Sequence, residues 1–231
     1  MCNYSEYKVE LVSRQTGKVL SQLDLVSEPL RVCLVGRDRA AVTLGWAQNV
    51  QLIKIKGNKL VKDKVLEVNG YVCGITTSGD NLVVTYVRQP WLEAISTDGK
   101  VLQQFHSTGK TQHFKCPDFI TTSPDGTLWV SDQGNNTITK MDASLTILQT
   151  FTSPLLEWPR GITAVTEDEI LVCSQGNNSL VLLQPITNTW STLLLEDDGI
   201  KKPYSLAYCS QKRKIFVAPR NTDSIQVFKF T

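Results

Sequence analysis

Cysteine and histidine are the residues of this chain best suited to bind a metal or to act as nucleophiles. The chain has six cysteines and two histidines, and no two cysteines lie within four residues of each other. The Cys-x-x-Cys half-site of a zinc centre is therefore missing. Cys33 lies between Val32 and Leu34, and Cys173 follows Leu171 and Val172. We predict free thiols that pack as small apolar side chains, in the reducing environment of the cytoplasm.

Other residue patterns that support catalysis are also missing from the sequence. His106 and His113 fall in one connecting segment, and there is no Ser/His/Asp order and no glycine-rich phosphate loop. Asp118 and Asp132 are the only acids near the strands that would line a central site, whereas a hard cation needs clustered oxygen ligands. We expect no catalytic residue, no cofactor, no metal site and no enzymatic activity in this chain.

The elements that would position functional residues repeat along the chain. A short apolar strand ends in valine plus a small residue five times, with spacings of 42, 46, 42 and 45 residues. The valines are Val42, Val84, Val130, Val172 and Val217. Eight residues after each valine another apolar strand begins, at Val50, Leu92, Ile138, Leu180 and Ile225. The constant offset indicates one module copied along the chain.

Two further strands complete each unit. An apolar residue, usually three positions after a proline, precedes each module, at Val32, Ile75, Ile120, Ile162 and Leu206. Proline fits the start of a strand because it cannot donate a hydrogen bond inside a ladder. A fourth strand follows in most units, often after a turn such as Asp98-Gly99. Short strands in fours, without helical periodicity, predict the blades of an all-β β-propeller. A β-sandwich would not explain the constant offset.

We predict a single propeller domain over residues 1–231 with six blades. The units cover about 1–25, 26–68, 69–110, 111–153, 154–197 and 198–231. The first unit begins at its third strand, so we expect its first two strands, and the fourth strand missing from the last unit, to lie upstream of Met1 in a longer polypeptide. The alternative is a closed five-bladed ring in which residues 17–25 supply the last outer strand.

Two of the units carry a polar signature. Residues 117–142 read PDFITTSPDGTLWVSDQGNNTITKMD, and residues 159–180 read PRGITAVTEDEILVCSQGNNSL. These segments resemble the NHL repeat, with its Pro-x-Gly-Ile, Asp-Gly turn, Val-x-Asp and Asn-x-x-Ile pattern. Asp132 and Asn135 match it, whereas Ser174 replaces the aspartate in the next unit. The other three units have Leu44, Tyr86 and Pro219 at the aspartate position.

The whole chain resembles the degenerate NHL propellers that end tripartite-motif (TRIM) proteins. The resemblance implies the substrate- or partner-recognition domain of a TRIM-type E3 ubiquitin ligase. Ubiquitin-ligase activity and zinc binding would then reside in RING and B-box modules outside this sequence. Lactonase-like and lyase-like propellers have the same periodicity, so a propeller enzyme is a further alternative.

The Gln-Gly-Asn-Asn segments at 133–136 and 175–178 would form the tight link between second and third strands. Asn and Asp side chains bond to nearby backbone and tolerate left-handed conformations. We therefore predict a structural role in these turns for Asp132, Asn135, Asn136, Asn177 and Asn178.

Candidate binding residues lie in the loops that join second to third strands and each blade to the next, because binding residues concentrate in loops on a rigid scaffold. Trp, Tyr and Arg carry most interface energy. The candidates are Trp46, Arg88, Trp91, His113, Lys115, Trp158, Arg160, Lys201, Lys202, Tyr204 and Arg220, with Asn49, Gln89 and Asn221 beside them. Trp158 and Tyr204 adjoin prolines and could instead only cover blade junctions.

We favour a protein partner or ubiquitylation substrate over RNA. Bases could stack on exposed aromatic rings while Arg and Lys meet phosphates. However, the net charge is only +2, and Glu28, Glu157 and residues 196–198 place acids in the same linkers.

No apolar run approaches the ~20 residues that span a bilayer, and the first residues lack a signal-peptide layout. We predict a cytoplasmic protein without membrane contact.

Overall fold

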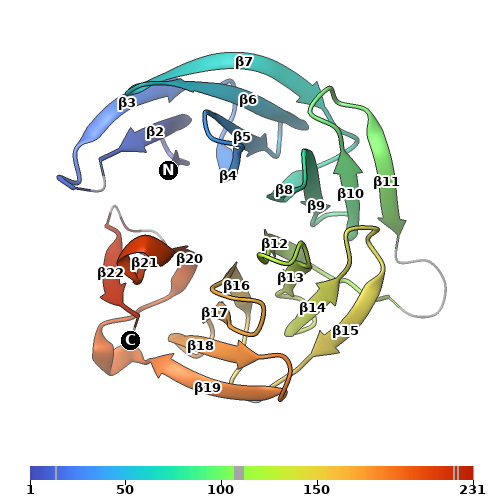
Figure 1. Cartoon of the computed structure of the whole chain (residues 1–231), viewed down its shortest axis with the longest axis vertical. Coiled ribbons are helices and arrows are strands. Elements are labelled where there is room, and N and C mark those ends of the chain that lie inside the picture. The colour runs from blue at the N-terminus through green and yellow to red at the C-terminus, as the bar shows by residue number, and fades with distance from the viewer. Residues whose placement is uncertain (14, 107–111, 221, 223, 231) are drawn as a thin grey trace. The chain divides into compact units, whose positions relative to one another are not determined.

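The computed structural model describes residues 1–13, 15–106, 112–220, 222 and 224–230 (Figure 1). The chain divides into two compact units, Met1–His106 and Ser107–Thr231, and each is described by itself. The single domain expected over residues 1–231 therefore stays a prediction. No helix among the described residues is long and apolar enough to cross a bilayer.

The first unit contains three antiparallel sheets whose strands follow one another in chain order. The first sheet consists of β1 (Cys2–Asn3), β2 (Lys8–Val12) and β3 (Val19–Asp24). The second consists of β4 (Pro29–Val35), β5 (Arg39–Leu44), β6 (Asn49–Lys56) and β7 (Lys59–Glu67). The third consists of β8 (Val72–Ser78), β9 (Asn81–Tyr86), β10 (Trp91–Ile95) and β11 (Val101–His106).

The second unit also contains three antiparallel sheets in chain order. The first consists of β12 (Pro117–Thr122), β13 (Leu128–Asp132), β14 (Thr137–Met141) and β15 (Ile147–Phe151). The next consists of β16 (Pro159–Ala164), β17 (Ile170–Ser174), β18 (Ser179–Gln184) and β19 (Thr189–Leu194). The last consists of β20 (Pro203–Cys209), β21 (Lys214–Pro219) and β22 (Gln226–Lys229). Short 3₁₀ turns at Glu196–Asp198 and Ser210–Lys212 flank β20.

The apolar markers of the sequence repeat lie opposite one another in the sheets. The pairs are Val32 with Val42, Ile75 with Val84, Ile120 with Val130, Ile162 with Val172 and Leu206 with Val217. Prolines open β4, β12, β16 and β20, as the sequence predicts. The five valines therefore occupy equivalent places in successive sheets, which confirms that one all-β module is repeated.

The first strand of each of these five sheets (β4, β8, β12, β16 and β20) has a shift in its pairing register directly after its opening residue. In β12 the shift lies between Pro117 and Phe119, and the other shifts follow Pro29, Val72, Pro159 and Pro203. A bulge displaces a residue from the ladder and re-aims its side chain. In the second unit the residues directly after these opening positions are Asp118, Arg160 and Tyr204.

The first sheet corrects one expectation. The sequence suggests that this unit lacks its first two strands, but Cys2–Asn3 forms β1 and pairs with β2. Cys2 lies opposite Val9, which is the register that Thr43 has opposite Val50 in the next sheet. A two-residue strand has too little apolar periodicity to be recognised from the sequence.

The five-bladed alternative is wrong. In that alternative residues 17–25 supply the outer strand of the last sheet, yet β3 pairs with β2 along most of its length. The described strands form six sheets, and the last has β20, β21 and β22 in that order.

Within each unit, buried apolar side chains of neighbouring sheets pack against each other. In the first unit Val42 and Ile53 belong to one cluster with Val9 of the preceding sheet and with Leu25, which directly follows β3. In the second unit Trp129 packs in one cluster with side chains of the sheet that follows it. A single sheet could not bury both of its faces, so this stacking forms the core.

Candidate functional site

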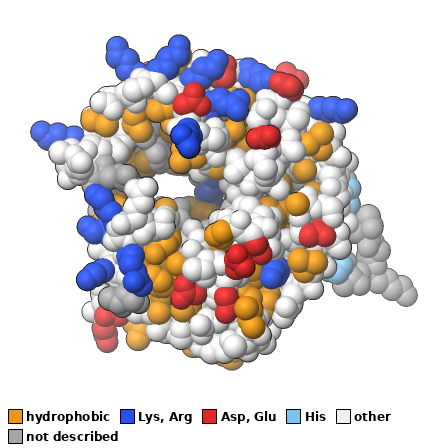
Figure 2. All heavy atoms as spheres, in the orientation of Figure 1, with side chains coloured by type: hydrophobic (Ala, Val, Ile, Leu, Met, Phe, Trp, Pro, Cys, Tyr) orange, Lys and Arg blue, Asp and Glu red, His pale blue; other side chains and the backbone are white. Residues whose placement is uncertain are grey.

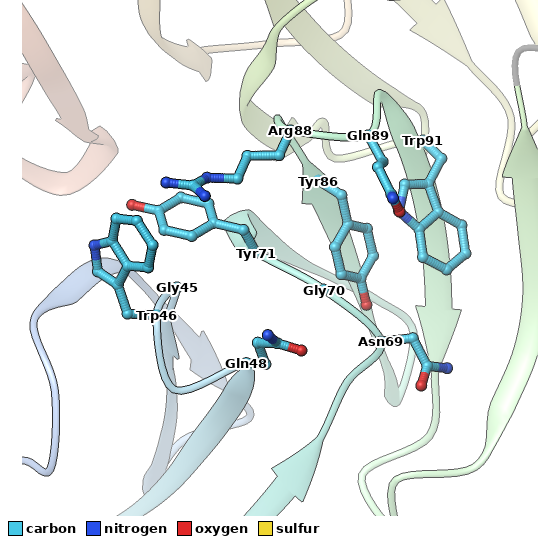
Figure 3. A pocket seen from close by; sticks show the side chains of 10 residues that line it. All are labelled: Gly45, Trp46, Gln48, Asn69, Gly70, Tyr71, Tyr86, Arg88, Gln89 and Trp91. Carbon is cyan, nitrogen blue, oxygen red and sulfur yellow. The ribbon is translucent and has the colours of Figure 1, made fainter.

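A pocket of about 430 Å³ lies in the first unit, at one end of the second and third sheets (Figure 3). Three segments supply most of its wall: the β5–β6 loop, the chain before β8, and the β9–β10 loop. Its lining residues are Gly45, Trp46, Gln48, Asn69, Gly70, Tyr71, Tyr86, Arg88, Gln89 and Trp91. The pocket therefore brings together Trp46, Arg88 and Trp91 of the candidate binding residues.

The Arg88 guanidinium lies against two aromatic rings at the edge of the pocket. Its Cζ is 4.1 Å from the centroid of the Trp46 ring and 4.9 Å from that of the Tyr71 ring. The two rings meet edge to face, with centroids 5.2 Å apart and an interplanar angle of 81°. Electrostatic attraction between a cation and a ring face holds such a guanidinium in place. Figure 3 shows the side chain of Arg88 extended along Tyr71 towards Trp46.

Glycine at position 45 makes this arrangement possible. A Cβ at Gly45 would lie 2.8 Å from Tyr71 Cζ and 2.7 Å from Leu30 Cδ1. Any larger residue would push the Tyr71 ring away from the β5–β6 loop. The missing side chain at Gly45 thus lets the Tyr71 ring pack against the β5–β6 loop, where it meets Trp46.

A stack of rings supports the opposite side of the pocket. Tyr86 stacks on Trp91 with centroids 4.4 Å apart, and Trp91 stacks on His106 at 4.6 Å. Tyr86 Oη donates a hydrogen bond of 2.6 Å to the fully buried Glu93, whose other oxygen accepts from Gln104 Nε2 at 2.8 Å. Burial and the bond to Glu93 raise the pKa of Tyr86, so it stays a phenol and keeps this contact.

Tyr71 and Arg88 supply two hydrogen-bond donors at one edge of the pocket. Burial raises the pKa of Tyr71 to about 12, so its hydroxyl is protonated at neutral pH. Neither this hydroxyl nor the Arg88 guanidinium has a hydrogen-bond acceptor among the residues that the structure describes. Figure 3 shows both groups at the same end of the pocket, beside the Trp46 ring.

In the second unit a different group of candidates meets at the bulged ends of the first strands. Arg160 Nη1 donates to Asp118 Oδ2 at 2.6 Å, and their side chains are 11% and 5% exposed. Arg160 Nε also donates to Gln175 Oε1 at 3.3 Å. The Cζ atoms of Arg160 and Arg220 lie 5.3 and 6.0 Å from the Tyr204 ring centroid. Arg160 thus has its charge paired inside the fold.

Asp132 organises the turn in which the sequence places it. Its side chain is fully buried and accepts from the backbone N–H groups of Lys115 at 2.6 Å, Cys116 at 2.8 Å and Gly134 at 2.8 Å. Asn135 Nδ2 donates to the carbonyl of His113 at 3.2 Å. The turn is therefore bonded to the segment that leads into β12.

Asn136 and Asn178 connect their turns to the following sheet. Asn136 has a φ of 53°, and its Oδ1 accepts from the Trp158 N–H at 2.9 Å. Asn178 has a φ of 49°, and its Oδ1 accepts from the Lys202 N–H at 2.8 Å. Asn177 Nδ2 donates to the carbonyl of Leu155 at 3.1 Å. The two turns repeat one bonding pattern.

The remaining candidates do not line the pocket. Trp158 is 52% exposed, and the side chains of His113, Lys115, Lys202 and Arg220 are also at the surface. Lys201 Nζ lies 3.6 Å from Glu196. Asn221 lies outside the described residues.

The structure changes the candidate set at two positions: Trp91 was expected in a loop, and Tyr71 was not among the candidates. Trp91 lies within β10 rather than in a loop and is only 7% exposed. Tyr71, which the candidate set lacks, directly precedes the opening residue of β8. Trp158 and Lys202 hold the equivalent position before β16 and β20, so the repeat itself contained the signal for Tyr71.

A metal site is not apparent in the described part of the chain. No group of three or more His, Cys, Asp or Glu side chains among those residues could hold an ion. The expected lack of a metal or cofactor remains a prediction.

Comparisons with known proteins identify the fold of the chain. No protein-family model and no curated protein matches the sequence. A streptogramin B lyase structure is 15% identical, with 99% of this chain and 78% of that chain covered and a TM-score of 0.72. The chain is an all-β six-bladed β-propeller.

Other propeller structures match over similar lengths. Hydrazine synthase from Kuenenia stuttgartiensis is 17% identical, with coverage of 99% and 72% and a TM-score of 0.75. The propeller domain of Cps50 (Swd1) from Myceliophteria thermophila is 14% identical, with coverage of 98% and 78% and a TM-score of 0.69. At these identities the likeness shows the fold alone, and these proteins differ in their functions.

Proposed function

We propose that this propeller is a non-catalytic module that binds a protein partner at the pocket formed by Trp46, Tyr71 and Arg88. The observation that carries the proposal is the Arg88 guanidinium, which lies against two aromatic rings and has no acceptor among the described residues. Arg, Trp and Tyr are the residues that contribute most binding energy at protein interfaces. A side chain oriented before binding also loses less entropy when the partner arrives.

Exposed aromatic surface supports the same proposal. Trp46 is 56% exposed, although it belongs to a residue type that is usually well buried. A tryptophan side chain buries about 200 Å² in an interface, so covering the exposed part of Trp46 would contribute roughly 2–3 kcal/mol before entropy losses. Any partner that covers the β5–β6 loop would gain this free energy on binding.

The NHL-like signature adds a finer proposal about the protein to which the module belongs. Asp132 and Asn135 match the repeat and hold the β13–β14 turn in place. This likeness supports a partner- or substrate-recognition domain of a TRIM-type E3 ligase. The free cysteines, with Cys73 and Cys173 buried, are consistent with a cytoplasmic location.

RNA is the competing ligand class, because the same rings could stack bases. However, RNA binding depends on several phosphate contacts, and Arg88 is the one charged residue among the described residues that line the pocket. Figure 2 also shows acidic side chains among the basic ones on the visible face. Protein recognition is therefore favoured.

Affinity capture tests the proposed function. The tagged chain and its Trp46→Ala and Arg88→Gln variants serve as baits. Arg37→Gln is the matched control, since Arg37 is exposed in the β4–β5 turn and does not line the pocket. We expect a set of proteins that binds the wild type and Arg37→Gln directly and is lost from both pocket variants. An identical set with all four baits would contradict the proposal.

A pooled RNA sample provides the second arm of this experiment. We expect no binding that depends on Arg88, even at low ionic strength. RNA binding that weakens steeply with salt and is lost in Arg88→Gln would replace the protein proposal with RNA recognition. Circular dichroism and the thermal midpoint of each variant establish that it is folded.

A further inference from the structure

The donors at the pocket edge indicate which chemical group a partner presents. We propose that Arg88 and Tyr71 bind the carboxylate of an aspartate or glutamate side chain in an extended segment of the partner protein. This inference rests on the proposed protein-binding function and specifies the chemistry of the partner.

The first argument is the geometry of the free donors. A guanidinium presents N–H groups in a planar fork that matches the two oxygens of a carboxylate. The Tyr71 hydroxyl lies at the same end of the pocket and is protonated at neutral pH. A carboxylate placed there would accept charge-assisted hydrogen bonds from both residues. Arg88 is exposed, so a partner can reach the guanidinium, and the Trp46 and Tyr71 rings hold it in place.

The second argument comes from the same side-chain types in the second unit. Arg160 lies beside the Tyr204 ring, with its Cζ 5.3 Å from the centroid, and donates to the carboxylate of Asp118 at 2.6 Å. Arg88 lies 4.9 Å from the Tyr71 ring, with no carboxylate among the described residues bonded to it. The Asp118–Arg160–Tyr204 group therefore shows how an arginine beside a tyrosine holds a carboxylate in this protein.

The third argument is the charge of the pocket. The described lining residues include one cation and no acid. A phosphate group carries about −1.5 to −2 charges and is commonly bound by clusters of arginines. A single guanidinium instead matches a singly charged carboxylate. Glu28 acts on Tyr71 electrostatically, but it is buried, accepts a hydrogen bond from Ser27 at 2.7 Å and does not line the pocket.

The fourth argument separates side-chain carboxylates from a chain terminus. Terminal carboxylates are commonly captured by concave groups of backbone N–H donors. The Arg88 guanidinium and the Tyr71 hydroxyl are instead side-chain donors. An acidic side chain reaching in from an extended segment also leaves its backbone free to pass over the exposed Trp46 ring.

Peptide selection followed by calorimetry tests this inference. A phage-displayed library of dodecapeptides is selected on the full chain, with Arg88→Gln used to remove peptides that bind elsewhere. The selected peptides are synthesised with amidated C-termini, and each Asp or Glu is replaced in turn by Asn or Gln. We expect one such replacement to weaken binding at least about tenfold, as the loss of a charge-assisted pair should.

Variants of the pocket complete the test. The affinity should fall about tenfold in Arg88→Lys because the fork is lost, fall further but stay measurable in Arg88→Gln, fall severalfold in Tyr71→Phe, and remain unchanged in Arg37→Gln. In Arg88→Gln, replacing the critical acid should have no further effect, because the two groups act on each other.

Each other outcome has a definite meaning. Peptides that bind the pocket regardless of their acids would overturn the carboxylate inference and leave protein binding standing. Peptides that bind only with a free C-terminus would overturn the assignment to a side chain. Failure to select any peptide, or competition by pooled RNA, would count against both this inference and the proposed function.

Discussion

Arg160 Nη1 lies 2.6 Å from Asp118 Oδ2, and this bond joins the first strands of two neighbouring sheets in the second unit. Each residue directly follows a strand-opening proline, where the ladder register shifts. The two bulges therefore aim the side chains at each other. A pair this buried fixes geometry more than it adds stability, because both ions lose their hydration.

Breaking the Asp118–Arg160 pair should cost more than replacing both of its members. Asp118→Leu or Arg160→Met alone removes one charge of the buried pair and leaves the other without this counter-charge, and we expect each to lower the free energy of unfolding by about 3 kcal/mol. The double variant should lose clearly less than the sum of the two. Urea unfolding of the four proteins measures this, and additive losses would show that the pair is not coupled.

Asp132→Ala should destabilise the β13–β14 turn. The buried carboxylate accepts from the backbone N–H groups of Lys115, Cys116 and Gly134, which would all lose their acceptor. We expect a loss of about 2–4 kcal/mol in the free energy of unfolding. Asp80→Ala, at an exposed position, serves as the control and should change it by less than about 0.5 kcal/mol. Equal effects of the two substitutions on the urea midpoint would contradict this role of Asp132.

Gly161 and Gly176 should respond differently to alanine, although both are closely packed. A Cβ at Gly161 would lie 2.7 Å from the backbone N of Leu206, which cannot move away without distorting β20. At Gly176 the nearest atom is Cγ of Glu157, at 2.5 Å, and this flexible side chain can move. We expect Gly161→Ala to cost about 2–3 kcal/mol and Gly176→Ala less than about 1 kcal/mol. Thermal unfolding of both variants checks the order.

Cys173 should be protected from alkylation in the native state. Its side chain is fully buried, and this burial raises the pKa of the thiol. Since the thiolate is the reactive form, a raised pKa lowers its population at pH 8 and slows the reaction. Iodoacetamide should modify Cys173 slower than the half-buried Cys209 by a factor on the order of a hundred. Mass spectrometry of the peptides measures both rates, which should become similar in denaturant.

Much of the fold could be predicted because the repeat consists of short hairpins, whose residues lie close together in the sequence. The pairing of Val32 with Val42 depends on a short hairpin, and the offset of eight between Val42 and Val50 depends on the next one. Turn residues such as Asn136 show their preference for a left-handed backbone in the sequence itself. The short strand at Cys2–Asn3 could not be predicted because two residues carry no periodic signal.

The candidate site could be predicted only in part. Trp46 and Arg88 lie in loops and were identifiable by residue type, whereas Trp91 has the same chemistry but is buried between Tyr86 and His106. Nothing in a single sequence indicates that Arg160 is paired within the fold while Arg88 has no acceptor among the described residues. Only the packing of side chains from different strands distinguishes the two arginines.

By itself, the sequence determined the repeated module and the turns that close its hairpins, because these depend on neighbours a few residues apart, whereas the pairing of β3 with β2 decided between five and six blades. The tertiary structure decided which side chains meet between sheets. Asp118 and Arg160 are 42 residues apart in the chain, and their contact depends on two bulges and on how closely the sheets stack. Such contacts depend on backbone placement to within an ångström or so, which hydrophobic periodicity does not specify.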